Sequence, residues 1–524
     1  MATKKSAKKS TKKPAKKNVE KATKKASTKG TKGTPQKPVS TKTPQKNTNG
    51  AKDGTQGSLR VRMYRVGFGD FFLLTVPTGT GPAHILIDCG VHAGDIRTMR
   101  ACFEDLAEVT GRKLALVIAT HYHADHLSGF ASNYDDFAEF EVGMVWITNR
   151  LKPDNKDAKK FHAQITSLAD KLRLKLGMRL AALGARADDA EHLDSQQAFW
   201  MMQDALGVSL EAGGGSSNDK ALKLLTQGFK NGPPVHYYQG GDEPELPDVL
   251  KGAVTAEILG PAPIDSAGMF SGTDNKKEQY LAAAAEGELP ETDGFTPFEK
   301  DWPATADNYP PAAFREYRTQ EQIDRNEPGT PANLEAVLHA AQPDALLAMA
   351  DAVDGTLNNQ SLVILFTCRG KKLLFVGDAQ WGNWSYWLYG KKVTGADPGI
   401  TEKARSILGS IDFFKVGHHG STNANPIPAV KAINPNCASM CSTESAEHGP
   451  PPGKRPYGNP DKGTEVPRTE LMKALEEQTG NRLVRSDWIP AGGVEPSKDA
   501  LGELTALPAN FEQGELYVDY VFPD

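Results

Sequence analysis

The sequence lacks the long apolar run that a membrane-spanning helix requires. In 524 residues, no stretch approaches the roughly 18 consecutive apolar residues that cross a bilayer. The start of the chain is followed by no apolar segment of the secretory type. Cysteine is also scarce, because the chain holds only five, which are too scattered for a disulfide framework. These absences predict a chain without membrane association in a reduced, cytoplasmic compartment.

Arginine is absent from the first 52 residues, which contain 17 lysines and one acidic residue, Glu20. This segment carries a net charge of +16, while the 44 basic and 64 acidic residues of the remainder give −20. Its Lys, Thr, Ser, Ala and Pro residues cannot bury apolar surface, so we expect a disordered tail over 1–57. Flexible lysines neutralise phosphates without reading sequence, so residues 1–52 predict a nonspecific nucleic-acid partner. A solubility tail and an intramolecular partner for the acidic body are the alternatives.

Short strand-like runs that alternate with helical segments predict an α/β fold beyond residue 58. The expected strands are 59–66, 71–76, 84–88, 114–119, 143–148, 254–259, 361–367, 372–376, 411–416, 438–441 and 515–522; the expected helices are 95–109, 155–182, 189–206, 218–229, 399–408, 427–433 and 467–478. Residues 262–334, rich in Pro, Gly, Asp and Glu, form a long irregular excursion, either a lid or a surface insertion. We expect a first half-domain over 58–150, a mostly helical and irregular insertion over 151–352 with a core strand near 254–259, and a second half-domain over 353–524.

The strongest chemical signal is the sequence THYHADH at 120–126, directly after the apolar run 114–119. Four side chains that bind metals leave the end of a buried strand within six residues, namely His121, His123, Asp125 and His126. Imidazole and carboxylate ligands suit zinc, manganese or iron(II). In an extended turn, the side chains of His121 and His123 point in the same direction, and those of Asp125 and His126 point to the opposite side. The segment can therefore supply ligands to two neighbouring ions. A solvated His-rich loop is the alternative.

Two further ligand-type sites also follow predicted strands. Asp378 comes after the run 373–377, and His418 and His419 lie in a glycine-flanked turn after 413–417. Alone, each is a weak signal, because Asp often caps a helix and paired histidines are often surface or hydrogen-bonded core residues. Together with the first cluster, in this order, they predict a metal site assembled from both halves of the chain.

These motifs resemble those of the metallo-β-lactamase superfamily, and within it the soluble domain of bacterial competence (DNA-uptake) proteins. The matching stretches are VGFGD at 66–70, LIDCG at 86–90, the cluster at 121–126, NNQSLV at 358–363, FVGD at 375–378, VGHHGS at 416–421 and, more weakly, YGNP at 457–460. The likeness covers about 58–150 and 353–524. It implies a four-layer αββα sandwich with a metal site at one edge of two facing sheets.

The resemblance also implies roles for the individual residues. His121 and His123 would bind one ion, Asp125 and His126 a second, and Asp378 would bridge both. Of the histidine pair, we expect His418 to complete the second site and His419 to face the substrate as a catalytic residue. A hydroxide between two divalent ions, zinc or alternatively manganese or iron(II), would be the nucleophile, oriented or deprotonated by Asp125.

Two departures from the family pattern concern the same site. Many members have a further histidine ligand before the bridging aspartate, but none of His162, His192, His236 and His339 follows a convincing strand. The first metal position would then be open, or completed by water or Asn359. In addition, Asn459 stands where a histidine is usual in the competence branch, which would remove a substrate contact or a proton donor.

The combined features predict a binuclear metal-dependent hydrolase, with a phosphodiester of nucleic acid as the expected substrate. The metal site indicates hydrolysis, and the lysine-rich tail and competence-type motifs indicate the substrate. A hydrolase of a small ester, lactone or phosphoester is one alternative. A metal-binding nucleic-acid-binding module without catalysis is the other. The likeness does not imply β-lactam hydrolysis, because a shared fold does not carry a substrate.

Overall fold

The computed structural model describes residues 57–92, 95–183, 190–207, 216–263, 343–390, 399–444, 465–497, 504 and 506–523. All of them belong to one compact unit, Asp53–Asp524. The predictions for the tail (1–57, apart from Gly57), for nearly all of the excursion 262–334 and for the YGNP motif at 457–460 lie outside the described residues. Among the described helices, none has the length and apolar character needed to span a bilayer.

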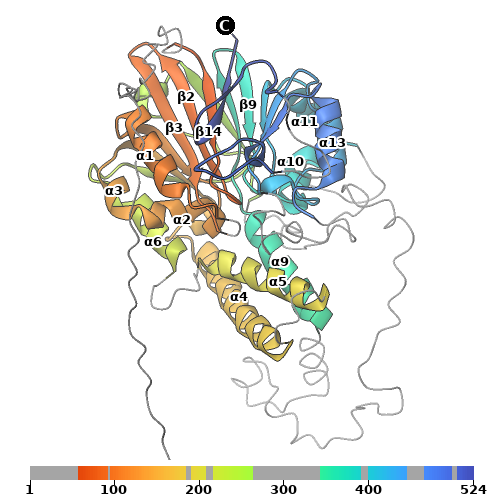
Figure 1. Cartoon of the computed structure of the whole chain (residues 1–524). Coiled ribbons are helices and arrows are strands. Elements are labelled where there is room, and N and C mark those ends of the chain that lie inside the picture. Colours follow the sequence, from red (N-terminus) through yellow and green to blue (C-terminus); the bar gives the residue numbers. More distant parts are fainter. Residues whose placement is uncertain are drawn as a thin grey trace, which may run out of the picture. The chain divides into compact units, whose positions relative to one another are not determined.

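Two β-sheets pack face to face around the main hydrophobic core (Figure 1). The eight-stranded sheet runs in the order β13 (Phe511–Gln513), β14 (Tyr517–Val521), β1 (Arg60–Tyr64), β2 (Phe71–Thr78), β3 (Gly81–Cys89), β4 (Lys113–Ala119), β5 (Glu141–Thr148) and β6 (Val235–Tyr238). The six-stranded sheet runs in the order β12 (Leu483–Arg485), β11 (Ala438–Cys441), β10 (Phe413–Lys415), β9 (Lys371–Phe375), β8 (Val363–Cys368) and β7 (Val254–Gly260).

Strand periodicity explains why helices cover both outer faces. In β2, Phe72 and Leu74 enter the core between the sheets, whereas Phe71 and Leu73 pack in a second cluster beneath the helices. The first sheet is covered by α1 (Met99–Thr110), α2 (Ala124–Ser132), α3 (Tyr134–Ala138) and α6 (Ser217–Lys223); the second by α10 (Trp381–Tyr389), α11 (Glu402–Leu408), α12 (Ile427–Ala432) and α13 (Thr469–Gln478). The predicted αββα sandwich is confirmed.

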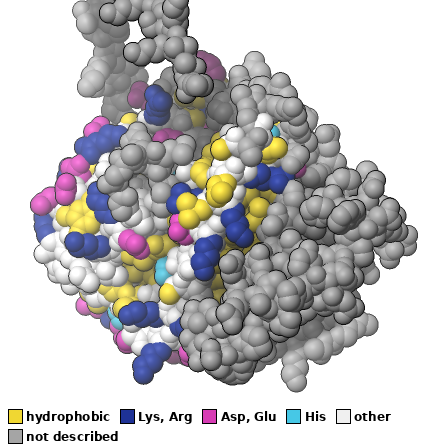
Figure 2. Space-filling model, turned by 90° about the horizontal axis from the view of Figure 1, so that it is seen from below, with side chains coloured by type: hydrophobic (Ala, Val, Ile, Leu, Met, Phe, Trp, Pro, Cys, Tyr) yellow, Lys and Arg dark blue, Asp and Glu magenta, His cyan; other side chains and the backbone are white. Residues whose placement is uncertain are grey.

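The segment 151–352 contributes more than an appended insertion. It supplies β6 and β7, each at the edge of one sheet. Three of its helices, α4 (Lys156–Leu183), α5 (Ala190–Leu206) and α9 (Pro343–Asn358), share a separate apolar cluster and project from the sandwich (Figure 1). Seen from below, hydrophobic side chains lie beside Lys and Arg over these helices (Figure 2).

The strand directions bring the predicted site residues to one edge. Strands β3, β4 and β5 are parallel to one another, as are β9, β10 and β11. The residues at 120–126 follow β4, Asp378 follows β9, and His418 and His419 follow β10. Since loops at the carboxyl ends of parallel strands share one edge of a sheet, both halves of the chain contribute side chains to the same place.

A buried ion pair joins the two sheets close to this edge. Arg65, after β1, lies 3.2 Å from a carboxylate oxygen of Glu444, which follows β11, and both side chains are fully buried. Burial and the nearby Asp487 raise the pKa of Glu444 to about 7, although Arg65 opposes this rise. The carboxyl group therefore keeps its proton in the folded chain at pH values where an unfolded chain has lost it.

Glu444→Gln is expected to remove a pH dependence of stability. In the wild type, the free energy of unfolding contributed by Glu444 is fully present below pH 4.5 and falls as the pH rises to about 7, by at most about 3 kcal/mol. Urea unfolding between pH 5 and 8 measures this decline, with the exposed Glu512→Gln as control. An equally steep decline in Glu444→Gln would contradict the prediction.

Candidate metal centre

The four site residues at 121–126 lie at the junction of β4 and α2. His121 lies two residues after the end of the strand, and His123 occupies the N-cap of α2 with extended backbone angles. Asp125 and His126 lie in the first turn of this helix, where a carboxylate is favoured by the helix dipole. The segment therefore changes from extended to helical backbone between its two pairs of ligand-type side chains.

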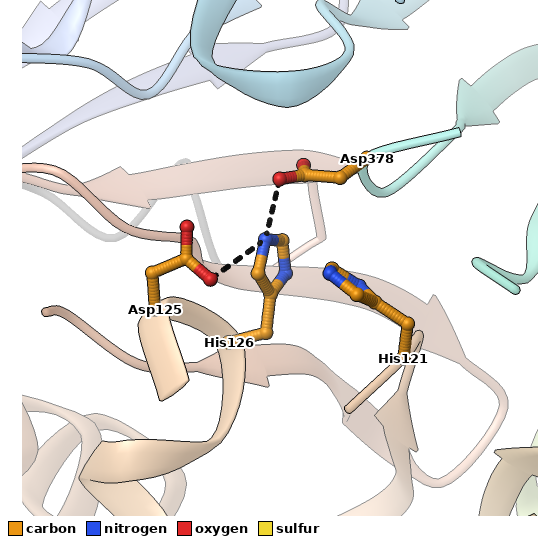
Figure 3. A group of neighbouring side chains, drawn as sticks. All are labelled: His121, Asp125, His126 and Asp378. Atoms are coloured by element: carbon orange, nitrogen blue, oxygen red, sulfur yellow. Dashed lines mark ion pairs between the residues drawn. The ribbon is translucent and has the colours of Figure 1, made fainter. Parts of the chain in front are cut away.

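Four of the predicted ligands come together in a tight group (Figure 3). His121, Asp125, His126 and Asp378 offer ligand atoms that all lie within 4.8 Å of one another. His126 Nε2 is 3.0 Å from Asp378 Oδ2 and 3.7 Å from Asp125 Oδ1. Around a tetrahedral ion with bonds near 2.1 Å, ligand atoms lie about 3.4 Å apart, so these separations suit a shared divalent ion.

The hydrogen bonding of this group supports the same conclusion. His121 Nε2, Asp125 Oδ1, His126 Nε2 and Asp378 Oδ2 are buried without a hydrogen-bond partner. Leaving a buried polar atom unpaired costs about 1–3 kcal/mol. Four such atoms that converge on one point fit a bound cation, which would accept lone pairs from all of them.

The adjacent histidines differ in how they face this group. His419 is fully buried, and its Nδ1–H donates to the carbonyl oxygen of Ser442 at 2.8 Å. This leaves Nε2 directed to Asp125 Oδ2 at 2.9 Å and to Asp378 Oδ2 at 3.5 Å. The nearest approach of His418 to Asp378 Oδ2 is 3.9 Å, and its side chain is 17% exposed. His419 Nε2 therefore lies closer than His418 to the carboxylates of Asp125 and Asp378, but neither histidine belongs to the four-residue ligand group, and the choice between them stays a prediction.

Two alanine variants distinguish these roles. If His419 is the ligand, His419→Ala is expected to weaken metal binding by about 100-fold or more, since it removes a nitrogen that lies 2.9 Å from Asp125 Oδ2 and 3.5 Å from Asp378 Oδ2. His418→Ala is expected to keep the metal content and to lower kcat. Elemental analysis after dialysis and calorimetric titration with Zn²⁺ or Mn²⁺ measure both effects. The opposite pattern would restore the assignment expected from the sequence.

Two residues outside the predicted ligand set hold the group in place. Asp88 accepts hydrogen bonds from the backbone N–H of Thr120 at 2.8 Å and from His126 Nδ1 at 2.7 Å, which orients the His126 ring as carboxylates do for metal-binding histidines. Lys415 lies buried between Asp70 and Asp378, 3.3 Å from Asp378 Oδ1. Asp378 therefore turns only its other oxygen, Oδ2, toward the ligand group.

The pKa values separate neutral from charged side chains. Burial lowers the pKa of His121 well below its usual value and that of His123 to about 4, so both rings are neutral at pH 7. Burial also lowers the pKa of His126, but Asp378 and Asp125 outweigh it and raise the pKa well above its usual value. The Asp378 carboxyl has a pKa well below its usual range, because His126 and Lys415 outweigh burial. An incoming ion would displace the proton of His126.

The structure places His123 in a second group rather than with His121. Its ligand atoms lie within 4.8 Å of those of Asp125 and of Asp204, a residue of α5. Asn359, an expected substitute ligand, directs its side-chain oxygen to the backbone N–H of Asn383. His162 packs its ring against Tyr122, with centroids 4.4 Å apart.

The pocket beside the metal centre contains predicted site residues together with Asp204, Asp354 and apolar side chains that sequence reasoning missed. The side chains that line this pocket are Phe68, His92, His123, Asp125, Trp200, Met201, Asp204, Asp354 and His418. Burial and neighbouring carboxylates raise the pKa of both Asp204 and Asp354 well above the usual value. An available signal was a lone aspartate in an otherwise apolar helical stretch, as at Asp204 after the run AFWMM at 198–202.

Residues 65–132 match the family model of the metallo-beta-lactamase superfamily. The matched stretch contains His121, His123, Asp125 and His126, and ends well before Asp378. The matching model describes the superfamily as a whole, and it gives no evidence for the competence-type branch within it. None of the curated proteins matches the chain. Together with the His and Asp groups of the site, the match indicates a metal-dependent hydrolase.

Proposed function

We propose that this chain is a binuclear metal-dependent hydrolase that cleaves phosphodiester bonds, with nucleic acid as its substrate. The observation that carries the proposal is the convergence of buried, unpartnered nitrogen and oxygen atoms from the ends of β4 and β9. Two zinc ions, or manganese or iron(II), would be held by His121, His123, Asp125, His126, Asp378 and one of the two histidines at 418–419.

In hydrolysis, individual side chains of the site would have different roles. Bound divalent ions would supply Lewis acidity and an activated water nucleophile. Asp125, whose Oδ2 is 2.9 Å from His419 Nε2, would stay ionised and orient the attacking water, because His126 and His419 outweigh burial and hold its pKa well below the usual range. His418 lines the pocket with its Nδ1 2.8 Å from Ser421 Oγ, and burial lowers its pKa to about 4, so a neutral ring there is suited to face the substrate and to accept a proton.

Two features support a nucleic-acid substrate: the +16 charge of residues 1–52 and the likeness to competence-type motifs in the sequence. The test incubates purified full-length chain with single- and double-stranded DNA and RNA in the presence of Mn²⁺ or Zn²⁺. Cleavage that disappears in His123→Ala and Asp378→Ala supports the proposal. Absence of cleavage, or cleavage that survives both substitutions, refutes it.

The pocket favours a second candidate, a hydrolase of a small ester or phosphoester. Its lining by Phe68, Trp200 and Met201 suits the apolar part of a small organic group. A panel of small chromogenic esters and phosphodiesters, assayed with the same two variants as controls, tests this candidate. In that case the basic segment would have no part in substrate binding.

Removal of residues 1–52 separates the two candidates. For a nucleic-acid enzyme, the truncated chain is expected to bind DNA or RNA at least about tenfold more weakly and with a shallower dependence of log K on log salt, since fewer counterions are released. Fluorescence anisotropy across a salt series measures both quantities. A matched control keeps the length of the segment and replaces its lysines by glutamine. Unchanged affinity and slope would instead favour the small-molecule hydrolase.

A further inference from the structure

His123 lies between two carboxylates that come from helices outside the two sheets. Its Nδ1 is 3.7 Å from Asp204 Oδ2, and its Nε2 is 3.9 Å from Asp354 Oδ1. Asp204 belongs to α5 and Asp354 to α9, both outside the two sheets (Figure 1). These two helices therefore bring carboxyl groups to the one histidine of the 121–126 segment that does not join the four-residue ligand group.

The group formed by His123, Asp125 and Asp204 differs from an ordinary acidic cluster. Asp125 Oδ1 is a buried atom without a hydrogen-bond partner, and the side chains of His123 and Asp125 are 2% and 8% exposed. The unpartnered Nε2 of His123 faces Asp354, so it is Nδ1 that faces Asp204. The ion pairs that Asp204 forms with described residues involve only His92 and His123. An ionised carboxylate is costly to bury unless a cation neutralises it, and no lysine or arginine among the described residues does so for Asp204.

Each residue of this group offers an atom that suits a divalent ion. One oxygen of Asp204 accepts the backbone N–H of Asp125 at 3.0 Å, which fixes the carboxylate beside the N-terminus of α2. The other oxygen is the one that faces His123. Two atoms 3.7 Å apart can both lie about 2.1 Å from an ion placed between them.

We propose that His123, Asp125 and Asp204 hold a divalent ion, so that α5 supplies the protein ligand that the sandwich lacks at its first metal position. This inference rests on the proposed binuclear centre and names a residue that completes it. Asp125 belongs to both ligand groups, so the ions at the two positions share this carboxylate. This position has one imidazole and two carboxylates, so its ligands are harder, in the hard–soft sense, than those of the group that contains His121 and His126. Hard oxygen ligands favour Mn²⁺ over a softer ion at this position.

The experiment compares wild type, Asp204→Asn and Asp194→Asn after removal of metal with a chelator and reloading with Mn²⁺. Asp194 lies on the same helix, ten residues earlier or about 15 Å along its axis, and is the matched control. Elemental analysis counts manganese per chain, and electron paramagnetic resonance distinguishes coupled from isolated Mn²⁺. We expect two coupled ions in wild type and Asp194→Asn, and one isolated ion in Asp204→Asn.

A second substitution protects the test from a folding artefact. Asn at position 204 keeps an oxygen that accepts the Asp125 N–H but is a weak ligand, whereas Asp204→His restores a metal-binding atom. We expect Asp204→His to recover the second ion. Loss of this ion in both variants would mark a structural role and overturn the inference.

The remaining outcomes separate this inference from the proposed function. Two ions bound equally well by wild type and Asp204→Asn would overturn the role of Asp204 and leave the binuclear centre intact. Loss of an ion in Asp354→Asn but not in Asp204→Asn would also overturn it, because the ligand would then come from α9. A wild-type chain that binds no Mn²⁺ and no Zn²⁺ would refute the proposed function together with the inference.

Discussion

Asp378→Asn is expected to lower kcat/KM by roughly a thousandfold or more and to release at least one bound ion. Asp378 Oδ2 lies within 3.0 Å of His126 Nε2 and 3.5 Å of His419 Nε2, so it is the oxygen nearest the centre of the ligand group. An amide has the same shape but no negative charge, so it is a much weaker ligand for a divalent ion. A thousandfold loss corresponds to about 4 kcal/mol of transition-state stabilisation.

The same substitution at Asp412 is the matched control. Asp412 precedes β10, at the opposite end of the sheet from the site, and accepts the backbone N–H of Lys372 at 2.8 Å. Asp412→Asn is expected to change kcat/KM by less than about twofold. Metal content by elemental analysis and steady-state kinetics on the cleaved substrate test both variants. An Asp378→Asn chain with full metal content and activity within tenfold of wild type would contradict the proposed role.

Lys415→Met is expected to have the largest effect on stability, a loss of about 3–5 kcal/mol in the metal-free chain. The Lys415 side chain is 2% exposed, and its ammonium group lies between the buried carboxylates of Asp70 and Asp378. Methionine fills a similar volume but leaves both carboxylates without their cation. In the metal-loaded chain the loss is expected to be smaller, because bound ions would neutralise Asp378.

Urea unfolding with and without Zn²⁺ measures this difference. Lys372→Met is the control, since Lys372 lies on the neighbouring strand β9 and its ammonium group donates to the hydroxyl of Ser410 at 2.9 Å. The double variant Lys415→Met/Asp70→Asn is expected to recover part of the loss, because it removes one of the unpaired charges. A loss below about 1 kcal/mol in Lys415→Met would show that the two carboxylates do not depend on this lysine.

The sequence predicted the part of the site that is encoded locally. The residues at 121–126 lie within six positions after an apolar strand, so their spacing alone indicates a metal site. Asp378 and the histidine pair were found because each also ends a strand. By contrast, Asp204 is 79 residues from Asp125 and lies on a helix without a motif. Its approach to His123 depends on how α4, α5 and α9 pack together, which no local pattern reveals.

The fold shows the same division between local and long-range information. Long periodic segments such as α4 and the paired strands β2 and β3 were predicted close to their observed bounds. The four-residue strand β6 was missed, because VHYY shows no clear alternation. No element was predicted at α9, although this helix supplies Asp354. Nor does sequence order tell which of two adjacent histidines points inward, since this depends on left-handed backbone angles at both residues.

The pairing of β1 with β14 has a consequence for biosynthesis. One edge of β1 pairs with β14, near the C-terminus, with Arg60 opposite Val521. In the same way, Asp125 contacts His419, which lies 294 residues later in the chain. At about 5–20 residues per second, the ribosome needs roughly 15–60 seconds to make the chain between these two residues. Throughout that interval, the early ligand side chains have emerged without their later partners. Tight metal capture is therefore a late event of synthesis, coupled to closure of the sandwich.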